Sequence, residues 1–206
     1  MLIEKIERLK NSEVKEIIDK RIKEFKEFKN KDNKEWFKEL CFCLLTANFS
    51  AEKCIKIQKE IDDGFLTLSR EELENKLKEL GHRYYKKRAE YIVLARRYKN
   101  IKDIITSFRD ERKAREFLVK NIKGLGYKES SHFLRNVGYD NVAIIDRHIL
   151  RELYENNYIL EIPKTLSKRK YLEIEKILEE IGREVNLNLA ELDLYIWYLR
   201  TGKVLK

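Results

Sequence analysis

The sequence predicts an all-α fold, for three reasons. Apolar residues recur every three or four positions along most of the 206 residues, which is the period of an amphipathic helix. The chain contains only one Pro and seven Gly, so it has few helix breakers. It is rich in Lys, Glu and Ile, and charged residues make up 39% of it. A chain of this length is expected to form one or two small domains with a real core.

The N-terminal part is expected to form helices on either side of a polar joint. Residues 2–29 show apolar positions at helical spacing between charged ones, which indicates one or two amphipathic helices. Residues 29–35 (KNKDNKE) carry no apolar residue and are interpreted as a domain boundary. From Trp36 to Leu45 the chain is apolar almost all round, so this helix is expected at the buried centre of a domain.

Capping residues divide the middle of the chain into shorter helices. Ser50 is expected to cap one helix, and Ser69, followed by Glu72, is expected to cap the next. The helices predicted after these span residues 88–99 and roughly 101–121, the second with a break near 107–108.

Beyond residue 148 the chain is again expected to be helical. One helix should run to about Glu155, and Pro163 marks the break that follows it. The pattern then predicts a strongly amphipathic helix over 167–183 and a final helix over about 186–200.

The charge balance is basic. The formal net charge is +9 and the pI is about 9.3. A basic surplus favours phosphate-bearing partners such as nucleic acid, although it is equally common on solvated surfaces.

The cysteines indicate a reducing compartment. Cys41, Cys43 and Cys54 are an odd set in apolar helical stretches, which argues against a disulfide framework. The N-terminus shows no signal peptide, and no apolar run approaches transmembrane length.

The most informative stretch is residues 122–148 (IKGLGYKESSHFLRNVGYDNVAIIDRH). Gly124 and Gly126 frame a short turn, Lys128 stands where an apolar helical pattern begins, and Asp146 follows that pattern. Taken singly, the glycines indicate a tight turn, the lysine a solvated side chain and the aspartate an N-cap. Their order and spacing together support a more specific interpretation.

That interpretation is a phosphate-binding turn beside a nucleophilic amine. The glycines let backbone N–H groups approach a phosphate, and the following helix presents its positive N-terminus to the same anion. This positive potential disfavours a second charge, so the Lys128 amine is expected to lose its proton near neutral pH and to form a Schiff base with an electrophilic carbon. Asp146 would stabilise an oxocarbenium-like centre.

These motifs resemble those of the helix-hairpin-helix DNA glycosylases. That family's signature is a hairpin of the form L-P-G-V-G-x-K, an apolar helix and then V-D-x-H, and residues 122–128 and 145–148 match it. Lys123 replaces the hairpin proline, a departure that does not touch the chemistry. The lysine marks the bifunctional branch, which cuts the glycosidic bond and then nicks the strand by β-elimination. By resemblance, Lys128 is the nucleophile and Asp146 is the family's carboxylate.

The resemblance also implies an architecture. It predicts two helical lobes with a helix-hairpin-helix motif and the active site in the cleft between them. Residues 36–135 are expected to form a helical-barrel lobe with the hairpin at about 112–135. Residues 1–35 together with 136–206 are expected to form the second lobe.

Asn48 matches a residue that enters the DNA helix in this family. The segment Leu44-Leu45-Thr46-Ala47-Asn48 is similar to one whose terminal amide fills the gap left by a flipped base. An amide suits this task because it can hydrogen-bond the orphaned partner base as both donor and acceptor. Without the resemblance, Asn48 reads as a loop residue that satisfies backbone groups.

Residues 81–92 mix aromatic and basic side chains at a helix start. They form either a solvated basic turn or a wedge whose rings stack on bases while its cations hold phosphate. The resemblance favours the wedge, and His82 is expected on the surface without a role. The candidates are Tyr84 and Tyr85 for stacking, and Arg83, Lys87 and Arg88 for backbone contacts.

The final helix carries a candidate base pocket. Asp193 and Trp197 are four residues apart and therefore share one face. Either the Trp docks the helix beside a solvated Asp, or the pair binds a purine. In animal-type 8-oxoguanine glycosylases a Gln and a Phe at the matching positions read and stack on the base, and a carboxylate suits the edge of guanine. The short tail, with Lys206 at its end, matches the archaeal-type branch, in which it lies by the lesion pocket.

The resemblance implies the partners and cofactors. The partner is double-stranded DNA containing oxidised guanine, bound in part by Gly124, Gly126 and His148, and no membrane is involved. No cofactor is required, and the iron–sulfur cluster of some relatives is expected to be absent because no cysteine follows residue 54. Family members often bind a monovalent cation through hairpin carbonyls, which here belong to Lys120, Ile122 and Leu125.

The protein is expected to act as a monomer in the cytoplasm, with the nucleoid. Two rival interpretations remain. One is a glycosylase of the same fold that acts on another oxidised base. The other is a non-catalytic helix-hairpin-helix protein that only binds DNA.

Overall fold

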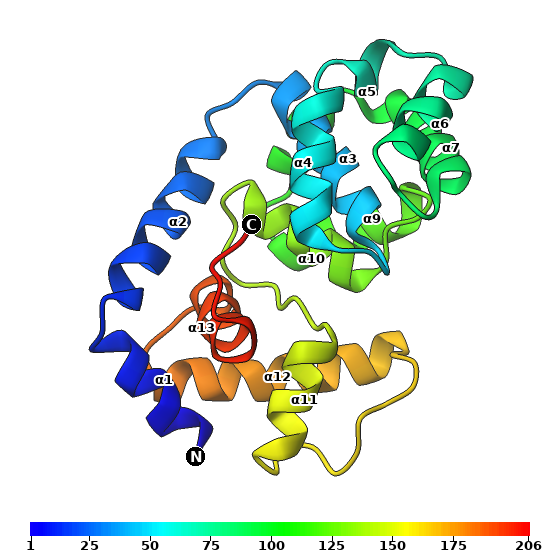
Figure 1. Ribbon diagram of the computed structural model, residues 1–206. Coiled ribbons are helices and arrows are strands. Elements are labelled where there is room, and N and C mark those ends of the chain that lie inside the picture. Colours follow the sequence, from blue (N-terminus) through cyan, green and yellow to red (C-terminus); the bar gives the residue numbers. More distant parts are fainter. The chain divides into compact units, whose positions relative to one another are not determined.

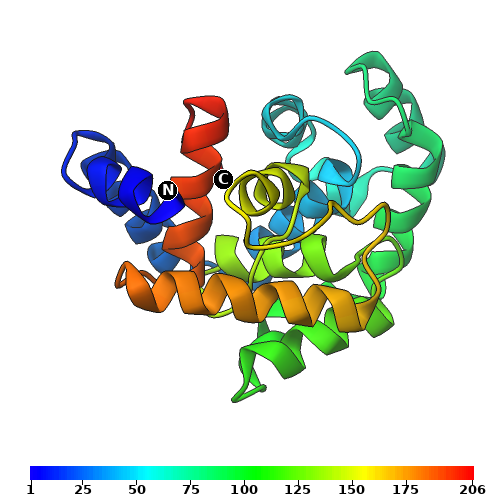
Figure 2. The same ribbon diagram turned by 90° about the horizontal axis from the view of Figure 1, so that it is seen from below.

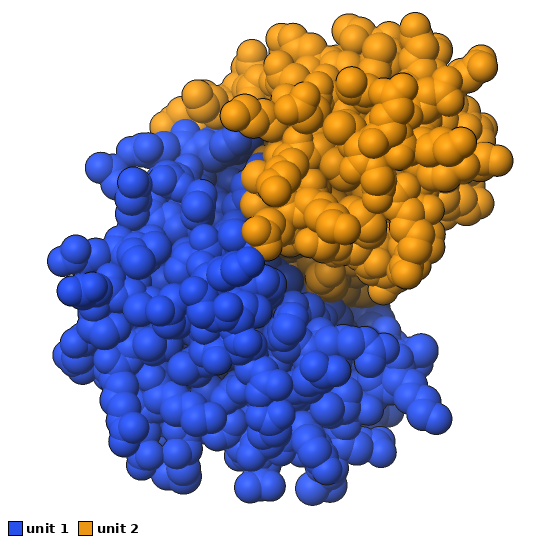
Figure 3. Space-filling view, in the orientation of Figure 1, with its two compact units in different colours: residues 1–29, 134–206 blue, residues 30–133 orange.

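The computed structural model covers residues 1–206 and consists of helices and connecting segments without a strand, as predicted. The chain divides into two compact units, coloured separately in Figure 3. Unit 1 comprises Met1–Lys29 and Leu134–Lys206, and unit 2 comprises Asn30–Phe133. The sequence placed the first boundary at residue 36. The polar joint falls almost entirely in unit 2, because Asp32 caps the first helix of that unit.

Unit 2 is organised around one buried helix. Its elements are α3 (Asn33–Thr46), α4 (Ala51–Ile61), α5 (Gly64–Thr67), α6 (Arg70–Glu79), α7 (Tyr85–Ala95), the 3-10 turn η1 (Arg96–Tyr98), α8 (Ile101–Thr106), α9 (Glu111–Asn121) and the start of α10 (Tyr127–Asn136). Helix α3 packs against α4, α5, α7 and α8. Every residue from Trp36 to Thr46 is buried, which confirms the predicted central helix.

The predicted caps of unit 2 are present. Ser50 Oγ accepts a hydrogen bond from the Lys53 N–H at 3.3 Å. Ser69 and Glu72 form a reciprocal capping box. A cap of this kind typically stabilises a helix by about 1 kcal/mol. The predicted break near residue 107 separates α8 from α9.

Unit 1 is organised around the last helix. Its elements are α1 (Leu2–Lys10), α2 (Val14–Phe28), the end of α10, α11 (Arg147–Glu155), α12 (Lys168–Glu184) and α13 (Leu189–Thr201). Helix α13 packs against α1, α2, α11 and α12. Figure 1 labels these helices, and Figure 2 shows α13 between the α1–α2 pair and α11.

Two helix starts differ from the predicted ones. Helix α13 begins at Leu189, not at residue 186, because Asn188 and Glu191 form a capping box there. Helix α7 begins at Tyr85, not at residue 88, so part of the aromatic and basic segment is itself helical. None of the helices is both long and apolar enough to cross a bilayer.

Candidate active site

The hairpin joins α9 to α10 through a tight turn. Ile122 ends α9, with its N–H on the Leu118 carbonyl at 2.9 Å. Gly124 has φ +96°, and a Cβ there would stand 2.3 Å from Cδ2 of Tyr91, so both its backbone and its packing require glycine. Gly126 does not have a positive φ. The sequence assigned both glycines to phosphate access, but at Gly124 the Tyr91 ring already covers the face that the missing side chain leaves open.

Lys128 lies in the first turn of α10, beside a carboxylate. Its side chain is half-buried, and Nζ lies 3.6 Å from Oε1 of Glu129. The other oxygen of Glu129 accepts a hydrogen bond from the Gly126 N–H at 3.2 Å. Glu129 therefore holds the hairpin backbone and the lysine together. The sequence interpretation passed over this residue, although a Glu at the third position of a helix is a known capping signal.

A buried thiol near Lys128 is not a competing nucleophile. Burial raises the pKa of the Cys54 thiol to about 12, against the opposing effect of the charges on Arg88 and Lys128. The thiol is therefore protonated at neutral pH, and a protonated thiol is a poor nucleophile. All three cysteines are free and buried. No group of three or more His, Cys, Asp or Glu side chains in the chain could hold a metal ion.

Asn48 follows the end of α3 in a left-handed conformation. Its φ is +56°, which Asn tolerates better than most residues, and its side chain is exposed. The turn is closed by the Phe49 N–H, which donates to the Thr46 carbonyl at 3.1 Å. An exposed amide is thus presented from a fixed backbone.

Arg88 and His82 hold the end of α3, and both differ from expectation. The buried Arg88 guanidinium donates to the Ala47 carbonyl at 2.7 Å, so its predicted phosphate contact does not fit its position. His82, expected on the surface, is buried: Nε2 lies 2.9 Å from the Leu45 carbonyl oxygen, and Nδ1 accepts from the Tyr84 N–H. Since α3 ends in the interior, its last carbonyls need such buried donors.

Burial lowers the pKa of His82, which favours the neutral ring. Its two hydrogen bonds fit one neutral tautomer, with the proton on Nε2. The ring also packs on Phe49, with centroids 4.1 Å apart. His82 is therefore a positioning residue for the turn that carries Asn48.

The other predicted wedge residues keep solvent access. The Arg83 guanidinium is exposed and lies 4.6 Å from the centroid of the Tyr84 ring. Tyr84 and Tyr85 are half-buried, and Lys87 is exposed. Aromatic faces and cations thus meet at the start of α7, as a base-stacking or phosphate-binding surface requires.

Asp146 ends an extended segment that α12 holds in place. Glu175 accepts from the Ala143 N–H at 2.8 Å. The Tyr171 hydroxyl donates to the Ala143 carbonyl at 2.6 Å and accepts from the Ile145 N–H at 3.2 Å. Both side chains are buried. They fix the backbone just before Asp146, and no pattern in the sequence identified them.

Asp146 is itself the N-cap of α11, so the plain interpretation of this residue is correct. Oδ1 accepts from the Ile149 N–H at 2.9 Å. Oδ2 accepts from the indole N–H of Trp197 at 3.3 Å. The His148 ring packs edge-on against Trp197, with centroids 5.4 Å apart. Unit 1 therefore brings together three predicted site residues, Asp146, His148 and Trp197.

Asp193 lies in the interior of unit 1, which corrects the role predicted for it. Its Oδ2 accepts a hydrogen bond from Nη1 of the buried Arg135. Arg135 also donates to the Asn136 side chain and lies over the Phe25 ring. The cation is needed because an uncompensated carboxylate would be costly to bury.

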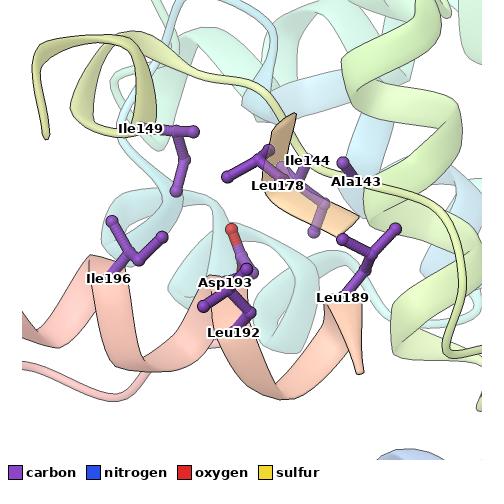
Figure 4. A pocket seen from close by; sticks show the side chains of 8 residues that line it. All are labelled: Ala143, Ile144, Ile149, Leu178, Leu189, Leu192, Asp193 and Ile196. Atoms are coloured by element: carbon purple, nitrogen blue, oxygen red, sulfur yellow. The ribbon is translucent and has the colours of Figure 1, made fainter. Parts of the chain in front are cut away.

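The space beside Asp193 is too small for a base. Figure 4 shows its carboxyl group pointing into a cavity lined by apolar side chains such as Ile144, Leu178 and Ile196. The cavity has a volume of about 10 Å³, which holds at most one water molecule. The Watson–Crick contact predicted for Asp193 does not fit this geometry.

The remaining predicted residues lie at chain and helix ends. Gly202, with φ +68°, ends α13, and the tail runs on to a half-buried Lys206. Among the carbonyls proposed for a cation, that of Ile122 accepts from the Leu125 N–H at 3.2 Å, which leaves it one lone pair. Lys128 belongs to unit 2 and Asp146 to unit 1.

The chain is similar to known proteins over its whole length. The Ogg-HhH family, described as 8-oxoguanine DNA glycosylase, matches residues 18–187. A relative from Methanocaldococcus jannaschii named 8-oxoguanine DNA glycosylase/AP lyase is 82% identical, with all of both chains covered. One of the same name from Korarchaeum cryptofilum is 59% identical, covering 100% of this chain and 98% of its own.

The chain is also similar to a solved structure. It is the crystal structure of Methanocaldococcus jannaschii 8-oxoguanine glycosylase/lyase in complex with 15mer DNA containing 8-oxoguanine. It matches with a TM-score of 0.99 at 81% identity, and the match covers the whole of both chains.

Proposed function

Because the chain belongs to the 8-oxoguanine DNA glycosylase family, we propose that it excises 8-oxoguanine from duplex DNA and then nicks the strand by β-elimination. The observation that carries this proposal is the full-length identity to the Methanocaldococcus jannaschii relative named 8-oxoguanine DNA glycosylase/AP lyase. The amine and the carboxylate that such a reaction needs are present as Lys128 and Asp146.

Lys128 supplies the nucleophile. In its neutral form the Nζ attacks C1′ of the damaged nucleotide, the C1′–N9 bond breaks, and the base leaves with the bonding electrons and takes up a proton. The C1′–O4′ bond then breaks, O4′ keeps the electrons and takes up a proton, and a protonated imine forms between Nζ and C1′. Glu129, whose carboxylate lies 3.6 Å from Nζ, is placed to accept the proton that the amine loses.

Asp146 stabilises the positive charge that develops on the sugar. Its two oxygens are held by the Ile149 N–H and the Trp197 indole, so the carboxylate does not need to reorganise during the reaction. Preorganised charge of this kind typically accelerates a reaction by about 10²–10³-fold.

Strand nicking follows from the imine. A proton leaves C2′, the C3′–O bond breaks with its electrons on the phosphate, and hydrolysis of the imine then releases Lys128. The imine makes this possible because it acidifies the C2′ protons.

Trp197 and Lys206 are the proposed base contacts. The Trp197 ring is half-buried and hydrogen-bonded to Asp146, so the stacking face and the charge beside the sugar come from one cluster. Asp193 is left out of this pocket because of its ion pair with Arg135.

The proposed DNA contacts come from two kinds of group. Asn48, Tyr84 and Tyr85 supply an amide and aromatic faces for exposed bases. The backbone contacts are proposed for the hairpin at Gly126, since the Tyr91 ring covers Gly124, and for Arg83, Lys87 and His148.

We propose that a monovalent cation binds to carbonyls of the hairpin. The carbonyls at the end of a helix lack intrahelical partners, and Lys120 lies in the last turn of α9. Carbonyls of Lys120, Ile122 and Leu125 would hold the cation, and it would add positive charge beside a phosphate. No other cofactor is proposed, and the site of action is the cytoplasm, on nucleoid DNA, with the chain as a monomer.

A panel of lesions tests the proposal. Duplexes carrying 8-oxoguanine, an oxidised pyrimidine or undamaged guanine at one position are incubated with the protein, and excision and nicking are followed separately. We expect both activities on 8-oxoguanine only. Preference for the oxidised pyrimidine would indicate a related glycosylase, and DNA binding without cleavage would indicate a non-catalytic protein.

A further inference from the structure

A cluster of cations surrounds one carboxylate beside the hairpin. Lys123, in the hairpin turn, donates to Oε1 of Glu90 at 3.0 Å. Oε2 of the same carboxylate lies 3.8 Å from Nζ of Lys87 and 3.8 Å from Nη2 of Arg70. These residues, together with Tyr91, are called the Glu90 cluster below. All of them belong to unit 2.

The cluster carries an excess of positive charge in contact with solvent. Arg70, Lys87 and Lys123 face Glu90, and Nε of Arg70 also donates to Oε1 of Glu74 at 3.0 Å, so three cations stand against two carboxylates. The hydrogen bond from Lys123 lowers the pKa of Glu90, which keeps that carboxylate ionised at neutral pH. The side chains of Arg70, Lys87 and Lys123 are 55%, 59% and 58% exposed, whereas that of Glu90 is only 23% exposed. An incoming anion would therefore meet the cations first.

Tyr91 ties the cluster to the hairpin. The Nζ atoms of Lys123 and Lys87 lie 5.6 Å and 5.8 Å from the centroid of its ring. The same ring covers Gly124 so closely that a Cβ there would lie 2.3 Å from it. The Tyr91 ring thus packs against both the lysines of the cluster and the hairpin turn.

We propose that the Glu90 cluster binds a phosphodiester group of duplex DNA beside the hairpin, with Arg70, Lys87 and Lys123 as its ligands. This rests on the proposed function, which makes DNA the partner. In the free chain Glu90 holds Lys123 and lies near Lys87 and Arg70, which Glu74 also holds, and these cations move in part to the phosphate when it binds. A phosphodiester fits because it is a compact anion that several flexible cations can approach from one side.

The test is the salt dependence of binding to a duplex that carries tetrahydrofuran, a stable abasic-site analogue. Kd is measured between about 50 and about 200 mM NaCl for the wild type and for Lys123→Gln. Each lost phosphate contact lowers the slope of log K against log salt by about 0.9, so the wild type should lose about threefold more affinity than the variant over this range.

Lys34→Gln is the matched control. Lys34 is an exposed lysine of the same unit and forms an ion pair with Asp63 at 2.6 Å, at the start of α5. Its removal takes away the same charge and one comparable ion pair. The slope for Lys34→Gln should equal that of the wild type.

Glu90→Gln distinguishes a phosphate-binding site from a set of ion pairs that only stabilises the fold. The substitution keeps the shape of the side chain and removes the charge that competes with phosphate, so the proposal predicts tighter binding and a steeper slope. Weaker binding by Glu90→Gln, or an unchanged slope for Lys123→Gln, overturns the proposal. Failure of the proposed function has another signature, since the wild type would then leave 8-oxoguanine DNA uncut.

Discussion

The predicted site residues of unit 1 are held differently from those of unit 2. In unit 1, Asp146 and Trp197 are hydrogen-bonded to one another, and Asp193 is locked in a buried ion pair. In unit 2, Arg83 and Lys87 are exposed cations, and Lys128 is tethered by a single ion pair at 3.6 Å.

The difference separates two tasks. A group that stabilises charge on a sugar works best when its position is set before the substrate binds, and Asp146, for which this role is proposed, has such a fixed position. A cation that grips a phosphate, or an amine that must travel to a carbon, works through a long and mobile side chain. In the proposed mechanism, unit 1 therefore contributes groups whose positions are fixed by hydrogen bonds, and unit 2 contributes long basic side chains that can extend to the DNA.

The largest effect is expected for the Lys128 amine. Lys128→Gln should slow the excision of 8-oxoguanine by at least about 10³-fold, because no other group replaces the nucleophile. Single-turnover excision at saturating enzyme measures this. Lys113→Gln, which removes an exposed lysine from α9, should keep the wild-type rate. A wild-type rate for Lys128→Gln would remove the amine from the mechanism.

The fixed geometry of unit 1 can be broken at its buried ion pair. Arg135→Met should lower the free energy of unfolding by about 3–5 kcal/mol, because it leaves the Asp193 carboxylate buried without its cation. Denaturant titration measures the loss, and the double variant Arg135→Met/Asp193→Leu should recover most of it. If Arg135→Met were as stable as the wild type, and Asp193→Ala lost affinity only for 8-oxoguanine, Asp193 would read the base after all.

Asp146 caps α11, and its negative charge is proposed to stabilise the sugar cation; two substitutions distinguish these two roles. Asp146→Asn keeps an oxygen for the Ile149 N–H, so stability should change by less than about 1 kcal/mol while excision slows by about 10²–10³-fold. Asp146→Ala should in addition lose about 1 kcal/mol of stability. Equal excision rates for Asp146→Asn and the wild type would leave Asp146 with the cap alone.

The smallest effect concerns pH and His82, the buried exception in unit 2. Burial lowers its pKa in the folded chain, so the unfolded chain binds the proton more tightly. Stability is then fully present above the unfolded pKa of about 6.5 and falls as the pH drops below it. His82→Gln, which can keep both hydrogen bonds, should flatten this fall between pH 7 and 5 in denaturant titrations. Identical pH profiles would show that His82 does not contribute.

What could be predicted from the sequence was local. The caps at Ser50 and Ser69, the hairpin turn and the cap at Asp146 all depend on residues within a few positions of each other. Glu129 belongs to this class as well, since its place in the first turn of α10 was visible.

What could not be predicted depends on partners far apart in the chain. Arg88 finds the Ala47 carbonyl 41 residues away, and Arg135 finds Asp193 58 residues away. Helical periodicity predicts which face of α13 Asp193 occupies, but it does not predict that the buried Arg135 packs against that face. The exposed cations of the Glu90 cluster likewise become a group only when α6, α7 and the hairpin pack together.

The most direct measurement maps the covalent intermediate. The protein is incubated with 8-oxoguanine duplex in the presence of borohydride, which reduces an imine to a stable amine, and the adduct is digested and sequenced by mass spectrometry. We predict that the nucleotide remnant is attached to Lys128. A remnant on any other amine, or no adduct while 8-oxoguanine is excised and the strand is cut, would contradict the proposed role of the hairpin lysine.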